Sequence, residues 1–237
     1  MTGLLVSAYR FNRMGEALRN KKINKILHVH LRRRELANNF DVAREMETIE
    51  ETCVPSYLHN NLLAASVAWW RLFASESLYR KYAPPGGVLD FGAASGELAH
   101  LLPSGTTYDF VETDENMVRF LQRAHPKAAR RSLESLPPRH YAAVFALDSL
   151  EHNDNVASIV DLLVEALCAD GVMILSGPTE NLLYKIGRRI AGFSGHYHKT
   201  TIVDIERIVA KRLPLERRRI LPLGVPLFSI SCWRKKA

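Results

Sequence analysis

The alternation of short apolar runs with helical patterns after residue 85 limits the possible folds of this chain more than any other feature. Expected strands lie at 88–91, 108–112, 128–132, 141–147 and 171–176, and expected helices at 96–102, 116–124, 156–168 and 202–212. Strands that alternate with helices form a parallel sheet with helices on both faces. Two final strand-like runs, 218–221 and 227–233, have only a short connection, which favours an antiparallel hairpin at one edge. We therefore predict an α/β fold with a doubly wound, mostly parallel seven-stranded sheet.

The first 84 residues have a different pattern and are predicted to form a helical extension. The strongest break in the chain is Pro84-Pro85-Gly86-Gly87. We place a domain boundary there, with a helical cap at 1–84 and the sheet domain at 85–237. The apolar segment 60–82 predicts one long helix. We expect its Trp69 and Trp70 to pack the cap onto the sheet domain.

The net charge of +7 is distributed unevenly along the chain. Residues 1–34 hold nine Lys and Arg and one acid, residues 35–184 hold ten bases and 21 acids, and residues 185–237 hold thirteen bases and three acids. Basic ends around an acidic middle suggest an anionic partner, either a membrane surface, a nucleic acid or a phosphorylated substrate; a solvated basic face is an equal alternative. An amphipathic, basic segment at 1–34 would suit peripheral contact with an anionic membrane.

Other classes of protein are disfavoured by composition. Three distant cysteines, Cys53, Cys168 and Cys232, indicate neither a disulfide framework nor a cysteine zinc site. No apolar run reaches the length of a membrane-spanning helix, and the first residues lack the pattern of a signal peptide. We expect a cytoplasmic protein, either free or bound peripherally to a membrane.

A glycine-rich turn is expected to follow the first strand, where open α/β sheets bind ligands. Residues 90–96 read Asp-Phe-Gly-Ala-Ala-Ser-Gly, and Gly92 and Gly96 would let backbone approach a ligand closely. Asp90, just before the turn, suits a cationic amine better than a pyrophosphate. Glu112 ends the second strand and could accept hydrogen bonds from both hydroxyls of a ribose, with Asp114 as the weaker alternative.

These stretches resemble the class I S-adenosylmethionine-dependent methyltransferases, which have a Rossmann-like fold. The resemblance rests on residues 89–96, Glu112, 133–137, 145–152 and 170–175. It implies S-adenosylmethionine as cofactor and a site made of Asp90, Gly92, Ala94 and Gly96 at the methionine end, Glu112 at the ribose, Thr113, Met117, Leu133 and Glu134 around the adenine, and Leu147 and Asp148 closing the pocket. The usual acid of the adenine loop is replaced here by Ser132 or displaced to Glu134.

Three histidines are candidates for the catalytic base. His196 and His198 flank Tyr197 after the fifth strand, where relatives build the acceptor pocket, and His152 follows the fourth strand. An imidazole of ordinary pKa can act as a general base, although loop histidines that bond backbone are a competing interpretation. We expect no metal, since no third ligand matches the histidine pair.

The leading functional prediction is O-methylation of a small or lipid-linked acceptor. If the acceptor is anionic, the basic ends of the chain would help to bind it. The sequence after the fourth strand, Ala146-Leu147-Asp148-Ser149, lacks the pattern of enzymes that methylate amino groups of bases. An RNA methyltransferase and a degenerate fold that serves as a binding subunit are the alternatives. Nucleic acid is the less favoured partner, because no aromatic-basic RNA module is present.

Overall fold

The chain folds into two compact units, Met1–Glu47 and Thr48–Ala237. The structure is a computed structural model, and it describes residues 24–42, 44, 49, 52–179, 200–222 and 226–236. In the first unit residues 24–39 are helical, which agrees with the predicted helical extension. The helix ends at Asn39, and the large apolar side chains of Ile26, Leu27 and Leu31 are exposed on it.

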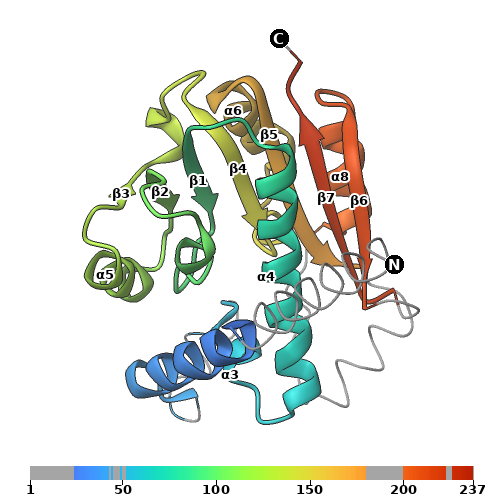
Figure 1. The fold of residues 1–237 in the computed structure, drawn as a ribbon. Helices are drawn as coiled ribbons and strands as arrows, with labels where there is room; N and C mark the ends of the chain where they lie inside the picture. Colours follow the sequence, from blue (N-terminus) through green and yellow to red (C-terminus); the bar gives the residue numbers. More distant parts are fainter. Residues whose placement is uncertain are drawn as a thin grey trace, which may run out of the picture. The chain divides into compact units, whose positions relative to one another are not determined.

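The second unit is built on one seven-stranded sheet (Figure 1). Its strands are β1 (Gly87–Phe91), β2 (Tyr108–Val111), β3 (Ala129–Arg130), β4 (Tyr141–Leu147), β5 (Leu167–Pro178), β6 (Leu215–Leu221) and β7 (Phe228–Arg234). The order is β3-β2-β1-β4-β5-β7-β6, and the first five strands are parallel. Only β7 runs antiparallel to its neighbours β5 and β6. The predicted parallel sheet with an antiparallel edge hairpin is confirmed.

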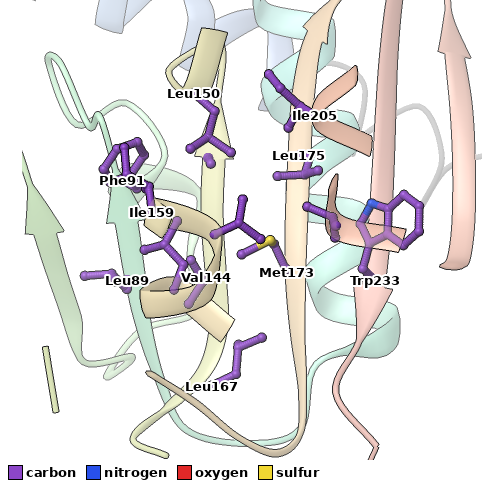
Figure 2. Packing of buried hydrophobic residues seen from close by; sticks show 14 of the residues in the cluster. Leu89, Phe91, Val144, Leu150, Ile159, Leu167, Met173, Leu175, Ile205 and Trp233 are labelled. Atoms are coloured by element: carbon purple, nitrogen blue, oxygen red, sulfur yellow. The ribbon is translucent and has the colours of Figure 1, made fainter. Parts of the chain in front are cut away.

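Helices lie on both faces of this sheet (Figure 1). They are α3 (Val54–Leu58), α4 (Leu62–Tyr82), α5 (Glu115–Ala124), α6 (Val156–Ala166) and α8 (Ile202–Ala210), and α3 packs against α4. Figure 1 shows α4 across one face and α6 with α8 on the other. Strand side chains alternate between the faces, so Leu89, Val144 and Met173 pack beneath α6 and α8 in the main apolar core (Figure 2). None of the described helices is long and apolar enough to cross a membrane.

α4 is fixed on the sheet by aromatic packing. The Asn61 side chain accepts hydrogen bonds from the Leu63 and Ala64 amides and so begins the helix. Tyr79 of α4 lies with its ring centroid 5.8 Å from that of Phe145 on β4, and Trp69 is buried with its ring centroid 4.8 Å from that of Tyr57 on α3. Trp70 is 55% exposed, so the expectation that it packs the cap is wrong. α3 and α4 precede residue 84 but belong to the same compact unit as the sheet. The domain boundary at residue 84 stays a prediction.

The helix predicted at 96–102 is wrong. Between β1 and β2 the chain forms only one turn of 3-10 helix, η1 (Ala99–Leu101). Gly96 has a φ of +72° and Pro103 follows η1 directly after Leu102. Fewer than two turns remain between these two residues, too few to offset the cost of starting an α-helix.

Candidate functional site

The predicted site residues meet at the carboxyl edge of the sheet. β1 lies between β2 and β4, so the loops that follow these three strands are neighbours. After β1 the chain adds β2 and β3 on one side of β1. It then crosses over and adds β4 on the other side of β1. Such a switch point is where open α/β sheets bind their ligands.

The glycine-rich turn is shaped by contacts with the protein itself. Gly92 has a φ of +71°, and a Cβ added there would lie 2.4 Å from the Cβ of Ser149 in the loop after β4. Gly96 also has positive φ, and its added Cβ would lie 2.2 Å from Cδ2 of Leu121 on α5. Both positions therefore require glycine, because the neighbouring elements occupy the space of a side chain. Ala94 takes a φ of +45°, a sparsely populated conformation for a residue with a Cβ.

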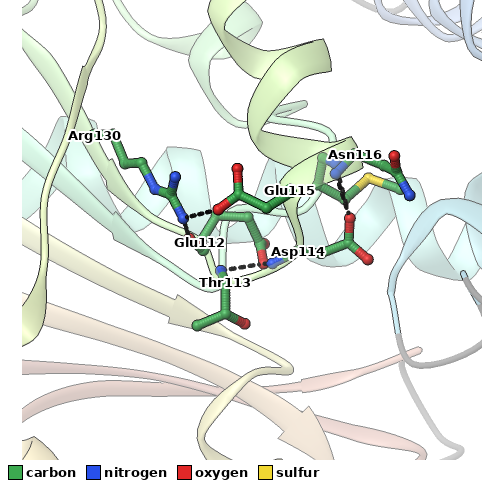
Figure 3. Close-up of polar contacts among 7 residues, drawn as sticks. Glu112, Thr113, Asp114, Glu115, Asn116 and Arg130 are labelled. Carbon is green, nitrogen blue, oxygen red and sulfur yellow. Dashed lines mark hydrogen bonds and ion pairs between the residues drawn. The ribbon is translucent and has the colours of Figure 1, made fainter.

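The Glu112 carboxylate ties this turn to the end of β2. Its Oε2 accepts the Ala94 amide at 2.7 Å. Its Oε1 accepts the amides of Thr113 at 2.7 Å and Asp114 at 3.0 Å, the neighbours shown in Figure 3. Three donors hold the carboxylate in one orientation. Since a carboxylate has about four lone-pair sites, about one remains for an external donor. Binding both hydroxyls of a ribose would require Glu112 to give up one backbone bond.

Asp90 lies in a buried, negatively charged environment at the end of β1. The Tyr108 hydroxyl donates to Oδ2 of Asp90 at 2.8 Å, and Asp90 is 4% exposed. Burial, together with the nearby charge of Glu112, raises the pKa of Asp90 to about 7, although the Tyr108 bond opposes the shift. Burial and the charges of Asp90, Glu112 and Glu97 raise the pKa of the Tyr108 hydroxyl. A cationic group would relieve this concentration of carboxylates.

An ion pair that the sequence did not reveal joins α4 to the loop after β4. Arg71 Nη1 contacts Oδ2 of Asp148, and both side chains are almost fully buried. Asp148 has a φ of +52°, and the Ser176 hydroxyl on β5 donates to its Oδ1 at 3.1 Å. The Arg71 guanidinium also lies 4.3 Å from the ring centroid of Phe228. The available signal was Arg71 itself, a lone charge within the apolar stretch 67–74 of α4.

Two buried hydroxyls show that the site fits a polar ligand. Within the described part of the chain, the Oγ atoms of Ser95 and Ser149 are buried and have no hydrogen-bond partner. They belong to the loops after β1 and β4. A buried hydroxyl without a partner costs about 1–3 kcal/mol, a cost that a bound ligand with polar groups would remove. The residues therefore fit a polar cofactor with cationic character.

The other predicted cofactor residues differ in exposure. Thr113 and Glu134 are exposed, whereas Leu133 and Leu147 are partly buried. Met117 is fully buried on α5. A contact of Met117 with adenine would require a rearrangement, and the contacts predicted for these five residues stay predictions.

The catalytic candidates are only partly visible. His152 lies in η3 (Leu150–His152), directly after β4, and is partly buried. His196 and His198 lie outside the described residues. Cys53 is a poor nucleophile here, because burial raises the pKa of its thiol to about 12. Among the described residues, no three metal-binding side chains come together.

Comparison with known proteins agrees with this geometry. The family model described as a methyltransferase domain matches residues 67–212. Magnesium protoporphyrin IX methyltransferase from Synechocystis PCC 6803, solved with bound SAH, has a TM-score of 0.57 at 20% identity, over 74% of this chain and 88% of its own. The PH0226 protein from Pyrococcus horikoshii OT3 has a TM-score of 0.62 at 15% identity, over 80% of this chain and 99% of its own.

The N-methyltransferase NodS from Bradyrhizobium japonicum WM9 has a TM-score of 0.56 at 14% identity, over 76% of this chain and all of its own. These identities are low, so the solved structures establish the fold alone. None of the curated proteins matches the chain. The family model spans more than half of the sequence, and on that basis the chain belongs to the methyltransferase-domain family, the class I S-adenosylmethionine-dependent methyltransferases.

Proposed function

We propose that this protein binds S-adenosylmethionine at the carboxyl edge of β1, β2 and β4 and methylates an oxygen atom of a small or lipid-linked acceptor. The observation that carries the proposal is the Glu112 carboxylate, which backbone amides from two loops hold in place beside the glycine-rich turn. A carboxylate fixed in this way can accept one ribose hydroxyl without first losing side-chain freedom, and a second hydroxyl would replace one of the backbone amides.

Three groups of residues would hold the cofactor. Glu112 would bind the ribose, Asp90 the positively charged amino group, and the hydroxyls of Ser95 and Ser149 other polar atoms. The bound cofactor supplies an electrophilic methyl group on a sulfonium. Asp90 is half ionised near pH 7, so binding of an amine cation would favour its ionised form and release a proton.

The acceptor would be bound beyond the end of β4. Asp148 is fixed there by Arg71 and Ser176, and His152 follows within one turn. An acceptor hydroxyl must lose its proton during methyl transfer, and His152, His196 and His198 are the proposed bases. The basic segment 1–34 is proposed to contact an anionic membrane; its described part exposes Ile26, Leu27 and Leu31.

Calorimetric titration with S-adenosylmethionine and S-adenosylhomocysteine tests the cofactor site. We expect micromolar binding to the wild-type protein and a large loss in Glu112→Ala. The matched control is Glu165→Ala, an exposed acid on α6 outside the predicted site, whose removal should change affinity little if Glu112 is the ribose ligand. No binding by the wild-type protein, or full binding by Glu112→Ala, would overturn the assignment.

The base is tested after an acceptor has been found by screening hydroxylated metabolites and lipids. His196→Ala should keep the affinity for S-adenosylhomocysteine and lower turnover. Unchanged turnover would remove His196 from the mechanism, and the same comparison then applies to His152 and His198.

A further inference from the structure

The amino-terminal half of α4 carries large apolar side chains into solvent. Leu62 is 70% exposed, Leu63 79% and Trp70 55%. Leu63 and Trp70 are seven residues apart, so they share one face of the helix, and Leu62 borders it. We call these three side chains the apolar patch. Neighbouring Trp69 is 2% exposed, so the helix separates a packed face from an apolar face that the described residues leave open.

The apolar patch lies at the same end of the unit as the candidate site. Trp70 precedes Arg71, which contacts Asp148 directly after β4. Leu62 is nine residues before Arg71, or about 13 Å along a helix that rises 1.5 Å per residue. Figure 1 shows this half of α4 continuing past the carboxyl ends of β1 and β4. The patch therefore extends outward from the edge where an acceptor would enter.

Cationic side chains accompany the patch. Arg219 on the edge strand β6 donates from Nη1 to the carbonyl of Ala74 on α4 at 3.5 Å, one helical turn after Trp70. Arg217 is exposed and lies two residues earlier in β6, so it points to the same face of the sheet as Arg219, farther from the carboxyl edge. The surface beside α4 thus combines exposed apolar groups with positive charge.

This combination fits an anionic lipid surface better than a second copy of the chain. A two-fold dimer buries the same surface of both copies, so a second copy would bring another set of the same positive charges to the interface. An anionic bilayer instead neutralises arginines and accepts apolar side chains, and tryptophan is favoured at the boundary between lipid and water.

We propose that the apolar patch inserts into the interface of an anionic membrane and turns the carboxyl edge of the sheet toward the lipid. The acceptor is then a molecule held in that membrane by an apolar tail. The acceptor class rests on the proposed methyltransferase function, whereas the membrane contact does not depend on it.

Vesicle binding by the full chain without cofactor tests the contact. The probes are vesicles of phosphatidylcholine, alone or mixed with phosphatidylglycerol, in a flotation assay. We expect binding to the mixed vesicles, weakened about tenfold or more by the triple change Leu62→Ser, Leu63→Ser and Trp70→Ser. The matched control removes Leu162 and Val203, exposed apolar residues of α6 and α8 on the opposite face, and should bind like wild type.

Tryptophan fluorescence locates the contact. The chain has three tryptophans, and Trp69 and Trp233 are 2% and 3% exposed, so lipid reaches only Trp70 directly. Brominated lipids should quench the wild-type protein in mixed vesicles and should not quench Trp70→Phe. This readout separates the apolar patch from membrane contact through residues 1–34, which would leave Trp70 unquenched.

Several results would overturn the proposal. These are a triple variant that binds mixed vesicles like wild type, the absence of Trp70 quenching, or a wild-type dimer in light scattering that the triple change dissociates. The triple variant should bind S-adenosylhomocysteine like wild type, which shows that it folds. If neither the wild-type protein nor the triple variant binds S-adenosylhomocysteine while the vesicle results hold, the methyltransferase proposal fails and the membrane contact stands.

Discussion

Replacing Asp90 by asparagine should change how the stability of the fold depends on pH. The pKa of Asp90 is about 7 in the folded protein because of its burial, against an ordinary value of 3.8. Below pH 3.8 the carboxyl group is protonated in both states and carries no penalty. Between 3.8 and about 7 the unfolded chain ionises first and the folded state holds more protons, so wild-type stability falls as pH rises.

The size of the effect follows from this gap. At about 1.4 kcal/mol per pH unit, the interval from 3.8 to about 7 corresponds to about 4 kcal/mol. Asparagine cannot ionise, and its side-chain oxygen can still accept the Tyr108 hydroxyl. Asp90→Asn should therefore gain stability relative to wild type through this interval, with a constant difference above it.

Urea unfolding of both proteins, followed by tryptophan fluorescence across this pH range, measures the difference directly. Other titrating groups are common to both proteins, and the subtraction removes their contribution to first order. A difference in unfolding free energy that stays flat from pH 4 to above 7, or that favours wild type as pH rises, would refute the burial argument.

Three further predictions concern the cofactor, the ion pair and the turn. Affinity for S-adenosylhomocysteine should fall up to about tenfold per pH unit below 7 in wild type and should lose this dependence in Asp90→Asn, as titrations at several pH values would show. Arg71→Met should cost about 3–5 kcal/mol in urea unfolding by stranding the Asp148 carboxylate, and adding Asp148→Asn should restore most of it. Gly96→Ala should cost about 2–4 kcal/mol in the same assay, from strained φ plus the clash with α5. Gly105→Ala, with φ +84° and open space around it, should cost only about 1–2 kcal/mol.

The sheet could be predicted because its strands are marked locally. β4 is an uninterrupted apolar run, and the structure places it at the predicted residues 141–147. β5 is longer than predicted, since it begins at Leu167 and includes residues 168–170, Cys-Ala-Asp, whose side chains are partly or fully exposed. No apolar pattern marks such a segment. Leu167 pairs with Tyr141 and Val172 with Ala143, so the residues between Leu167 and Val172 form an irregularity in the pairing of β5 with β4.

The candidate site was predictable in position more than in detail. The spacing from Asp90 to Glu112 placed both carboxylates at one edge, where the structure finds them. The contact of Glu112 with the Ala94 amide joins residues 18 positions apart and depends on how the two strands align. Arg71 was missed because its partner, Asp148, is brought close only when α4 packs on the sheet. The roles of the site residues in binding and catalysis stay predictions.

The missing helix after β1 has a consequence for which charged ligands this edge admits. In dinucleotide-binding proteins the amino terminus of a helix at this position attracts a pyrophosphate. Here the loop holds only the short turn η1, and the neighbouring charges are those of Asp90, Glu97 and Glu112. A phosphate would meet repulsion where a sulfonium with its amine would meet attraction. We therefore expect the negative charge at this edge to favour a cationic cofactor over one that carries a pyrophosphate.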